Sequence, residues 1–127
     1  MIQKGTNLRV IDNSGAKRVA CIHVCGGYRK RYARTGDLIK VSIKTVKSKR
    51  RENSKIKAGD VVTALVVSTK VSKPSYSGSL LGFYENQVVL LTDKKKALGT
   101  RIFGYLLKDF RYTRFLKLMT LASGVLK

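Results

Sequence analysis

The excess of positive charge, and its position along the chain, constrains this sequence more than any other feature. The 127 residues include 27 Lys or Arg and only 7 Asp or Glu, a formal net charge of +20. Between Val61 and Thr92 the only basic residues are Lys70 and Lys73. A core built from this apolar middle must form despite strong repulsion between the cations. Such an excess of positive charge is typical of proteins that bind a polyanion. The length predicts one domain, residues 1–127.

Most of the other cations gather in four clusters, at residues 28–34, 47–57, 94–96 and 101–117. In the first cluster Tyr28 and Tyr32 lie among the cations. The segment therefore offers guanidinium groups that can bind phosphate and aromatic rings that can stack on unpaired bases. The second cluster reads as a long basic loop that could reach into folded RNA. A solvated charged surface is the alternative for any one cluster, but four clusters with so little acid favour RNA binding.

Alternating and β-branched segments predict that residues 1–98 form a small β-barrel. Residues 39–45 alternate between an apolar face and a face that carries Lys40 and Lys44, as in a half-buried strand. Residues 61–68 are apolar on both faces, as in a strand covered from two sides. The expected strands are residues 8–11, 18–24, 39–45, 61–68, 80–83 and 87–91. The last two are expected to pair as a hairpin.

The hydrophobic period changes after Gly99, so residues 99–127 are expected to form a helical appendage. Basic residues recur at every third position from 108 to 117, with apolar residues between them. Thr113 is a candidate helix cap and predicts two short helices rather than one long helix. The expected fold class is mainly β: a small barrel of five or six strands with a short C-terminal helical region.

Cys21, His23 and Cys25 share strand parity and would point to the same side of one strand. The two cysteines would then lie about 13 Å apart, too far for a disulfide. Ligands along one extended strand also cannot converge tetrahedrally on zinc. We therefore expect no metal site and no cofactor, but a half-buried His23 between two packed thiols.

Catalysis has little support in the sequence, so the protein is not expected to be an enzyme. The single His removes most acid–base schemes. Asp12, Asp37 and Asp60 each lie at a turn, where a carboxylate caps local N–H groups. A nuclease whose carboxylates are brought together by the fold stays as an alternative. No apolar run approaches the roughly 20 residues that span a membrane, so no membrane partner is expected.

Short motifs follow one another in a fixed order along the chain. They are DNSGAKR at 12–18, RYA at 31–33, GD at 36–37 and 59–60, VVSTK at 66–70 and GTRIFG at 99–104. Their order and separation resemble the bacterial-type family of large-subunit ribosomal protein number fourteen, over essentially the whole chain.

This resemblance implies a five-stranded β-barrel on the large ribosomal subunit, at the face that meets the small subunit. The implied partners are large-subunit rRNA, ribosomal proteins numbers three and nineteen, small-subunit rRNA through an intersubunit bridge, and a ribosome-silencing factor. By resemblance, Thr100, Arg101 and Lys117 form the bridge or silencing-factor surface, and Arg114 lies on the same basic stripe. Residues 29–34 correspond to an rRNA-facing segment.

Thirteen basic or aromatic positions are candidates for rRNA binding, on strands and on the first two basic clusters. They are Lys17, Arg18, Arg29, Lys30, Arg31, Tyr32, Arg34, Lys40, Lys44, Lys47, Lys49, Arg50 and Arg51.

Several departures from the family pattern favour a mitochondrial ribosome over a bacterial one. Gly104-Tyr105 stands where the family usually has Gly-Pro, and the basic loop at 47–57 is longer than usual. Richness in Lys, Tyr and Phe with a single Pro is typical of an A/T-biased organellar gene. An A/T-rich bacterium is the alternative source of this bias. An RNA-chaperone barrel that works off the ribosome is the alternative function.

Overall fold

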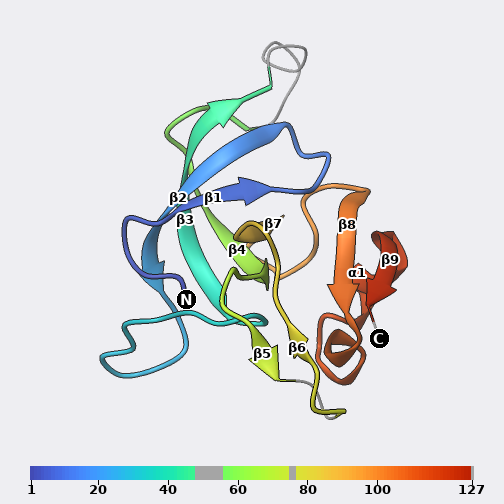
Figure 1. Cartoon of the computed structure of the whole chain (residues 1–127). Coiled ribbons are helices and arrows are strands. Elements are labelled where there is room, and N and C mark those ends of the chain that lie inside the picture. The colour runs from blue at the N-terminus through green and yellow to red at the C-terminus, as the bar shows by residue number, and fades with distance from the viewer. Residues whose placement is uncertain (48–55, 75–76, 127) are drawn as a thin grey trace.

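Five strands close a β-barrel in the computed structural model, which describes residues 1–47, 56–74 and 77–126 (Figure 1). Around the barrel they follow the order β1-β2-β3-β4-β7. β7 pairs antiparallel with β4 and parallel with β1, which closes the ring. The strands are β1 (Asn7–Val10), β2 (Ala16–Val24), β3 (Leu38–Val46), β4 (Val61–Ser68) and β7 (Gln87–Leu91). The mainly β fold with a five-stranded barrel is thus confirmed.

The remaining elements lie outside the barrel ring. Two short strands, β5 (Lys73–Pro74) and β6 (Leu80–Leu81), form a small antiparallel ribbon. The C-terminal segment contains β8 (Ile102–Leu107), the 3-10 helix η2 (Lys108–Tyr112), α1 (Leu116–Leu121) and β9 (Ala122–Leu126), and β8 and β9 pair in parallel. Within the described residues, no helix has the length and apolar character needed to cross a membrane.

β4 and β7 are buried on both faces and separate two hydrophobic cores. Ala64 and Val66 join the core inside the barrel, whereas Leu65 and Val67 join a second core outside it. Alternate residues of β7 divide in the same way. The second core lies between the outer face of these strands and the segment from β8 to α1. The prediction that residues 61–68 are covered from two sides is confirmed for residues 64–68, whereas Val61 is 62% exposed.

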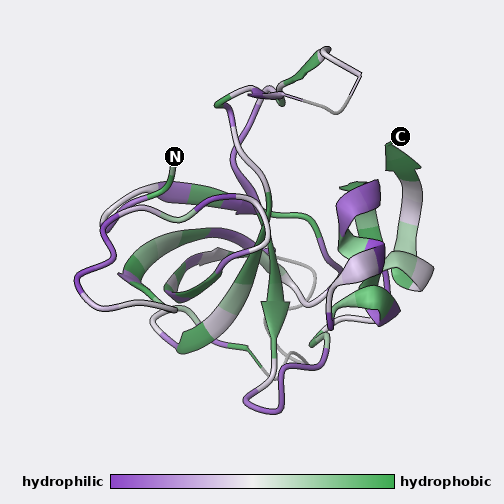
Figure 2. Cartoon of the chain, turned by 90° about the horizontal axis from the view of Figure 1, so that it is seen from below, coloured by the Kyte–Doolittle hydropathy of each residue, from purple (hydrophilic) through white to green (hydrophobic). Residues whose placement is uncertain are grey.

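Two turns of the same construction lead into β3 and β4. Gly36 and Gly59 adopt φ of 94° and 93°, a conformation that only glycine adopts readily. In each turn the following Asp accepts the N–H of the residue three positions before it, at 2.8 Å for Asp37 and 2.9 Å for Asp60. The capping predicted for these two carboxylates is confirmed. Hydrophilic residues dominate such connections, while hydrophobic residues follow the barrel strands (Figure 2).

The predicted hairpin between residues 80–83 and 87–91 is wrong. β6 pairs with β5, and β7 pairs with β4 and β1. The reason is that β7 is a central strand whose two edges are already occupied. The connection before β7 is held instead by β4, because the Ser68 hydroxyl donates to the carbonyl of Glu85 at 3.3 Å.

The C-terminal region contains the two short helical segments that were predicted on either side of Thr113, but also two strands that were not. The helices are η2 and α1, and β8 and β9 flank them. In β8, Ile102 and Leu106 are buried in the second core while Phe103 and Tyr105 are exposed. This burial pattern did not stand out in the sequence, because the basic spacing further along suggested a helix.

Candidate nucleic-acid interface

The turn after β1 is fixed to β7 by the buried carboxylate of Asp12. Asp12 is only 1% exposed, and its Oδ2 accepts the backbone N–H of Leu90 at 3.0 Å. Its Oδ1 accepts the backbone N–H of Ser14 at 3.1 Å and a short hydrogen bond from the Ser14 hydroxyl. Burial raises the pKa of the Asp12 carboxyl, and these hydrogen bonds oppose the shift. The carboxylate therefore stabilises its own turn and fixes that turn to β7, the strand that pairs with β1 to close the barrel.

The next residue, Asn13, holds the segment that precedes β8. Its Oδ1 accepts the backbone N–H groups of Thr100 at 2.7 Å and Arg101 at 3.1 Å. Its Nδ2 donates to the Thr100 hydroxyl at 2.7 Å. A Cβ on Gly99 would collide with Asn13 Oδ1, so only glycine leaves room for the amide. The motifs at 12–18 and 99–104, far apart in sequence, thus form one structure.

The chain turns back on itself after this segment. Ile102 in β8 lies opposite Ala122 in β9, so the end of α1 returns to the start of β8. Thr100 and Arg101 are exposed just before that point. Lys117 is exposed in the first turn of α1.

Thr113 makes the reversal between the two helical segments. Its hydroxyl donates to the carbonyl of Phe110 at 2.9 Å and accepts the N–H of Phe115 at 3.2 Å. Phe110 and Phe115, on either side of Thr113, are both buried in the second core, and their packing there holds the reversal in place. Arg114 is exposed, with its guanidinium 5.7 Å from the centroid of the Phe115 ring.

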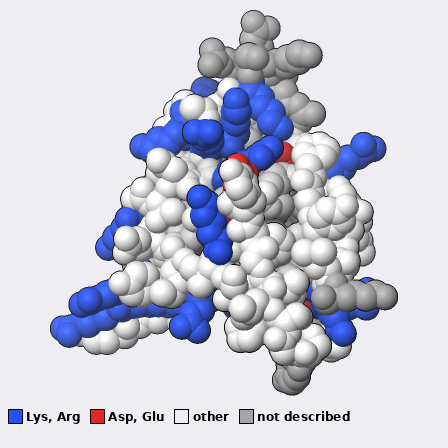
Figure 3. All heavy atoms as spheres, in the orientation of Figure 1, with Lys and Arg blue, Asp and Glu red and all other residues white. Residues whose placement is uncertain are grey.

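The loop between β2 and β3 carries the first basic cluster away from the barrel. Figure 3 shows basic side chains gathered at its tip and over β1 and β2, with few acidic side chains on the same face. Arg29 has a φ of 52°, in the left-handed region that is costly for a residue other than glycine. Its guanidinium lies 5.2 Å from the ring centroid of Tyr28, which is 90% exposed. Arg31, Tyr32 and Arg34 are also exposed.

Lys30 differs from its neighbours in this loop. Its ammonium pairs with the Asp37 carboxylate at 3.0 Å, and both side chains are about 30% exposed, at 30% and 29%. The stem of Lys30 also lies against Gly27, where a Cβ would approach within 3.4 Å. Lys30 therefore shapes the loop, and its charge is partly used inside the protein.

The remaining candidate residues are divided among several environments. Lys40 donates to the Thr63 hydroxyl at 2.8 Å and so bridges β3 and β4. The ammonium of Lys47 lies 5.7 Å from the ring centroid of Phe103. Lys17, Arg18 and Lys44 are exposed on strands. Lys49, Arg50 and Arg51 lie outside the described residues.

The model of the family described as Ribosomal protein L14p/L23e matches residues 1–126. The chain belongs to the L14p/L23e family. Membership supports a structural rather than enzymatic role in the large ribosomal subunit, with ribosomal RNA and ribosomal proteins as partners.

The shared strand parity predicted for Cys21, His23 and Cys25 is wrong in this L14p/L23e chain. The ladder between β2 and β3 shifts register between Cys21 and His23. As a result Cys21 is buried and His23 is exposed rather than half-buried. Both cysteines are free thiols. Over the described ranges, no three His, Cys, Asp or Glu side chains are placed to hold a metal ion.

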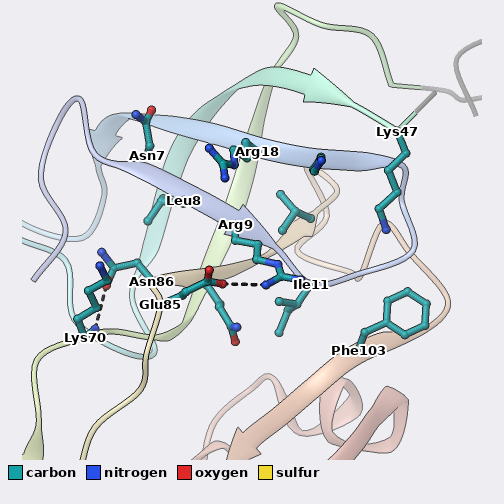
Figure 4. Close-up of a pocket in the computed structure, with 13 residues that line it drawn as sticks. Asn7, Leu8, Arg9, Ile11, Arg18, Lys47, Lys70, Glu85, Asn86 and Phe103 are labelled. Carbon is teal, nitrogen blue, oxygen red and sulfur yellow. Dashed lines mark hydrogen bonds and ion pairs between the residues drawn. The ribbon is translucent and has the colours of Figure 1, made fainter.

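The L14p/L23e barrel forms a groove beside β1, and sequence reasoning missed two of its cations and its aromatic residue. The groove has a volume of about 690 Å³, and Arg9, Lys70 and Phe103 help to line it (Figure 4). Strand parity could have revealed Arg9, because it lies between the buried Leu8 and Val10. Phe103 was missed because β8 was expected to be helical.

Because burial raises the pKa of the Asp12 carboxyl, this group makes the free energy of unfolding depend on pH. Its pKa is raised above the ordinary value of 3.8, so the folded state favours the protonated form. The stability that Asp12 contributes through this shift is fully present below the unfolded pKa and is lost as pH rises through the raised pKa. Asp12→Asn removes this titration, so the wild-type stability minus that of the variant should fall as pH rises from acid to neutral.

The measurement is urea unfolding of both proteins between acid and neutral pH. Asn supplies only one acceptor oxygen, so the N–H of Leu90 or Ser14 loses its partner at about 1–3 kcal/mol, whatever the pH. Asp93→Asn, at an exposed position, controls for loss of a surface carboxyl. A wild-type advantage that grows as pH rises would contradict the raised pKa.

Proposed function

We propose that this L14p/L23e protein binds large-subunit rRNA and contributes to a bridge with small-subunit rRNA. The observation that carries the proposal is the shortage of internal partners for its cations. The chain has a net charge of +20, yet the described residues form only three ion pairs: Arg9–Glu85, Lys30–Asp37 and Lys73–Asp109. Phosphates of RNA supply the missing counter-charges and release bound ions on contact.

The loop between β2 and β3 is the first proposed rRNA contact. Arg29 and Arg31 are exposed and have no carboxylate partner among the described residues, while Lys30 is held by Asp37. Guanidinium forks bind phosphate oxygens in pairs. The exposed tyrosines add ring faces for a ribose or an unpaired base. The exposed strand cations Lys17, Arg18 and Lys44 extend the same role along the barrel.

The second proposed contact is the bridge surface, made of Thr100, Arg101, Arg114 and Lys117. Asn13 fixes its first two residues, and the parallel pairing of β8 with β9 brings the helical segment back toward them. The surface suits a phosphate backbone of the small subunit or an acidic face of a ribosome-silencing factor, but not both at once. Subunit joining and silencing would then exclude each other without any change in conformation.

The finer assignments rest on the resemblance and on composition. Ribosomal proteins numbers three and nineteen are the proposed protein neighbours on the large subunit. The low proline and high lysine content support a mitochondrial ribosome over a bacterial one.

Removal of two guanidinium groups from the loop should weaken rRNA binding and flatten its salt dependence. Wild-type protein is expected to co-sediment with large subunits after a high-salt wash, and Arg29→Gln/Arg31→Gln to be released at lower salt. The slope of log affinity against log salt should fall by about 0.7–0.9 for each lost phosphate contact. Lys4→Gln removes an exposed charge outside the loop and outside the four basic clusters, and is the control, expected to keep the wild-type slope.

An unchanged slope in the loop variant would show that these side chains face solvent. Wild-type protein that stays at the top of the gradient would instead support a barrel that works off the ribosome.

Reversal of one charge on the bridge surface should weaken the binding of both proposed partners. Arg101→Glu presents a repulsive charge to a phosphate backbone and to an acidic protein alike. Subunit association, followed by light scattering at low magnesium, should weaken, while Lys4→Glu should behave as wild type. Normal association of the Arg101→Glu variant would place the bridge elsewhere on the protein.

A further inference from the structure

The groove beside β1 concentrates positive charge that the protein itself does not neutralise. Its lining includes Arg9, Lys17, Arg18, Lys47 and Lys70, with Glu85 as the lining acid. Glu85 is already paired with Arg9 at 2.9 Å. None of the other four cations takes part in an ion pair within the described residues. The groove therefore offers four cations to an external anion.

One wall of this groove is an aromatic ring rather than another charge. Phe103 is 57% exposed, because β8 directs its neighbour Ile102 into the second core. The backbone N–H of Phe103 donates to the carbonyl of Ile11 at 2.6 Å, which fixes the ring beside β1. Figure 4 shows Lys47 extending toward this ring, with the ammonium 5.7 Å from the ring centroid. The Lys47 ammonium lies over the ring, and the ring surface that stays exposed is available for a planar ligand.

We propose that the groove binds an unpaired nucleotide of RNA, with its base stacked on Phe103 and its flanking phosphates on Lys17, Arg18, Lys47 and Lys70. The inference rests on the proposed rRNA-binding function and specifies a site for it. The volume of about 690 Å³ is of the size that encloses a small ligand. A duplex presents phosphates but no free base face, so it would leave the ring unused. The combination of cations and an exposed ring selects single-stranded RNA.

The test compares Phe103→Ala with wild type on two probes. One is a short single-stranded oligouridine with a central 2-aminopurine, and the other is an RNA duplex of the same length. Loss of a stacking ring should lower the affinity for the single strand by roughly five- to a hundred-fold. The affinity for the duplex should stay unchanged, and the quenching of 2-aminopurine fluorescence on binding should disappear.

Two further variants control for general effects of the substitution. Phe103→Tyr keeps the ring and should restore both affinity and quenching. Tyr112→Ala removes another exposed ring, 83% exposed and outside the groove, and should bind both probes as wild type does. Thermal unfolding of each variant checks that the fold is intact, which is expected because Phe103 is largely exposed.

Two outcomes would overturn the site: unchanged single-strand affinity in Phe103→Ala, or an equal loss on both probes. The second outcome would mean that the groove reads phosphates alone. Neither outcome touches the proposed function, because that is judged by co-sedimentation of wild-type protein with large subunits. Failure of the wild type to enter large subunits would overturn the proposed function even if the oligonucleotide bound in the groove.

Discussion

The hydrogen bonds of two adjacent side chains, Asp12 and Asn13, hold Thr100 and Arg101 of the candidate bridge surface on the barrel. The buried Asp12 carboxylate accepts the N–H of Leu90 in β7, and the Asn13 amide accepts the N–H groups of Thr100 and Arg101. The N–H of Leu90 is buried, so loss of its acceptor would cost about 1–3 kcal/mol, whereas the two N–H groups that donate to Asn13 lie at an exposed position. The position of the exposed residues Thr100 and Arg101 is therefore set by their contact with Asn13, next to the paired strands β1 and β7, rather than by their own loop.

Double burial of β4 and β7 lets a small, highly charged chain support this arrangement. These strands supply residues to the core inside the barrel and to the core beneath β8, η2 and α1. Apolar side chains thus concentrate in a few central strands, and cations are left to the loops and outward strand faces. In the proposed complex with rRNA, phosphate groups would relieve the repulsion among these cations.

Local chemistry in the sequence predicted much of the fold, and long-range contacts account for what it missed. Strand β4 matched residues 61–68, and Asp37 and Asp60 cap their turns because the required groups lie within four residues. The pairing of β6 with β5 and the strand character of β8 depend on partners far along the chain. The register shift after Cys21 is likewise set by β3, so parity within β2 could not reveal it.

The same distinction between local chemistry and long-range contacts applies to the candidate site. In the sequence the motif at 12–18 served only to support the family resemblance, and its structural role appears when Asn13 contacts Thr100 and Arg101 across the fold. The pairing of Lys30 with Asp37 likewise separates a cation that shapes its loop from those that point outward. Charge counting treats all of these cations alike, whereas the structure distinguishes them by their partners.

Amide hydrogen exchange in an Asn13→Ala variant tests the central claim most directly. Loss of the Asn13 acceptor should lower protection at the amides of Thr100 and Arg101, while barrel amides such as that of Val66 keep theirs. Asn86→Ala is a matched control, because Asn86 Oδ1 accepts the backbone N–H of Lys70 at 2.9 Å and its loss should affect that amide instead. Unchanged protection at Thr100 and Arg101 in Asn13→Ala would contradict the account.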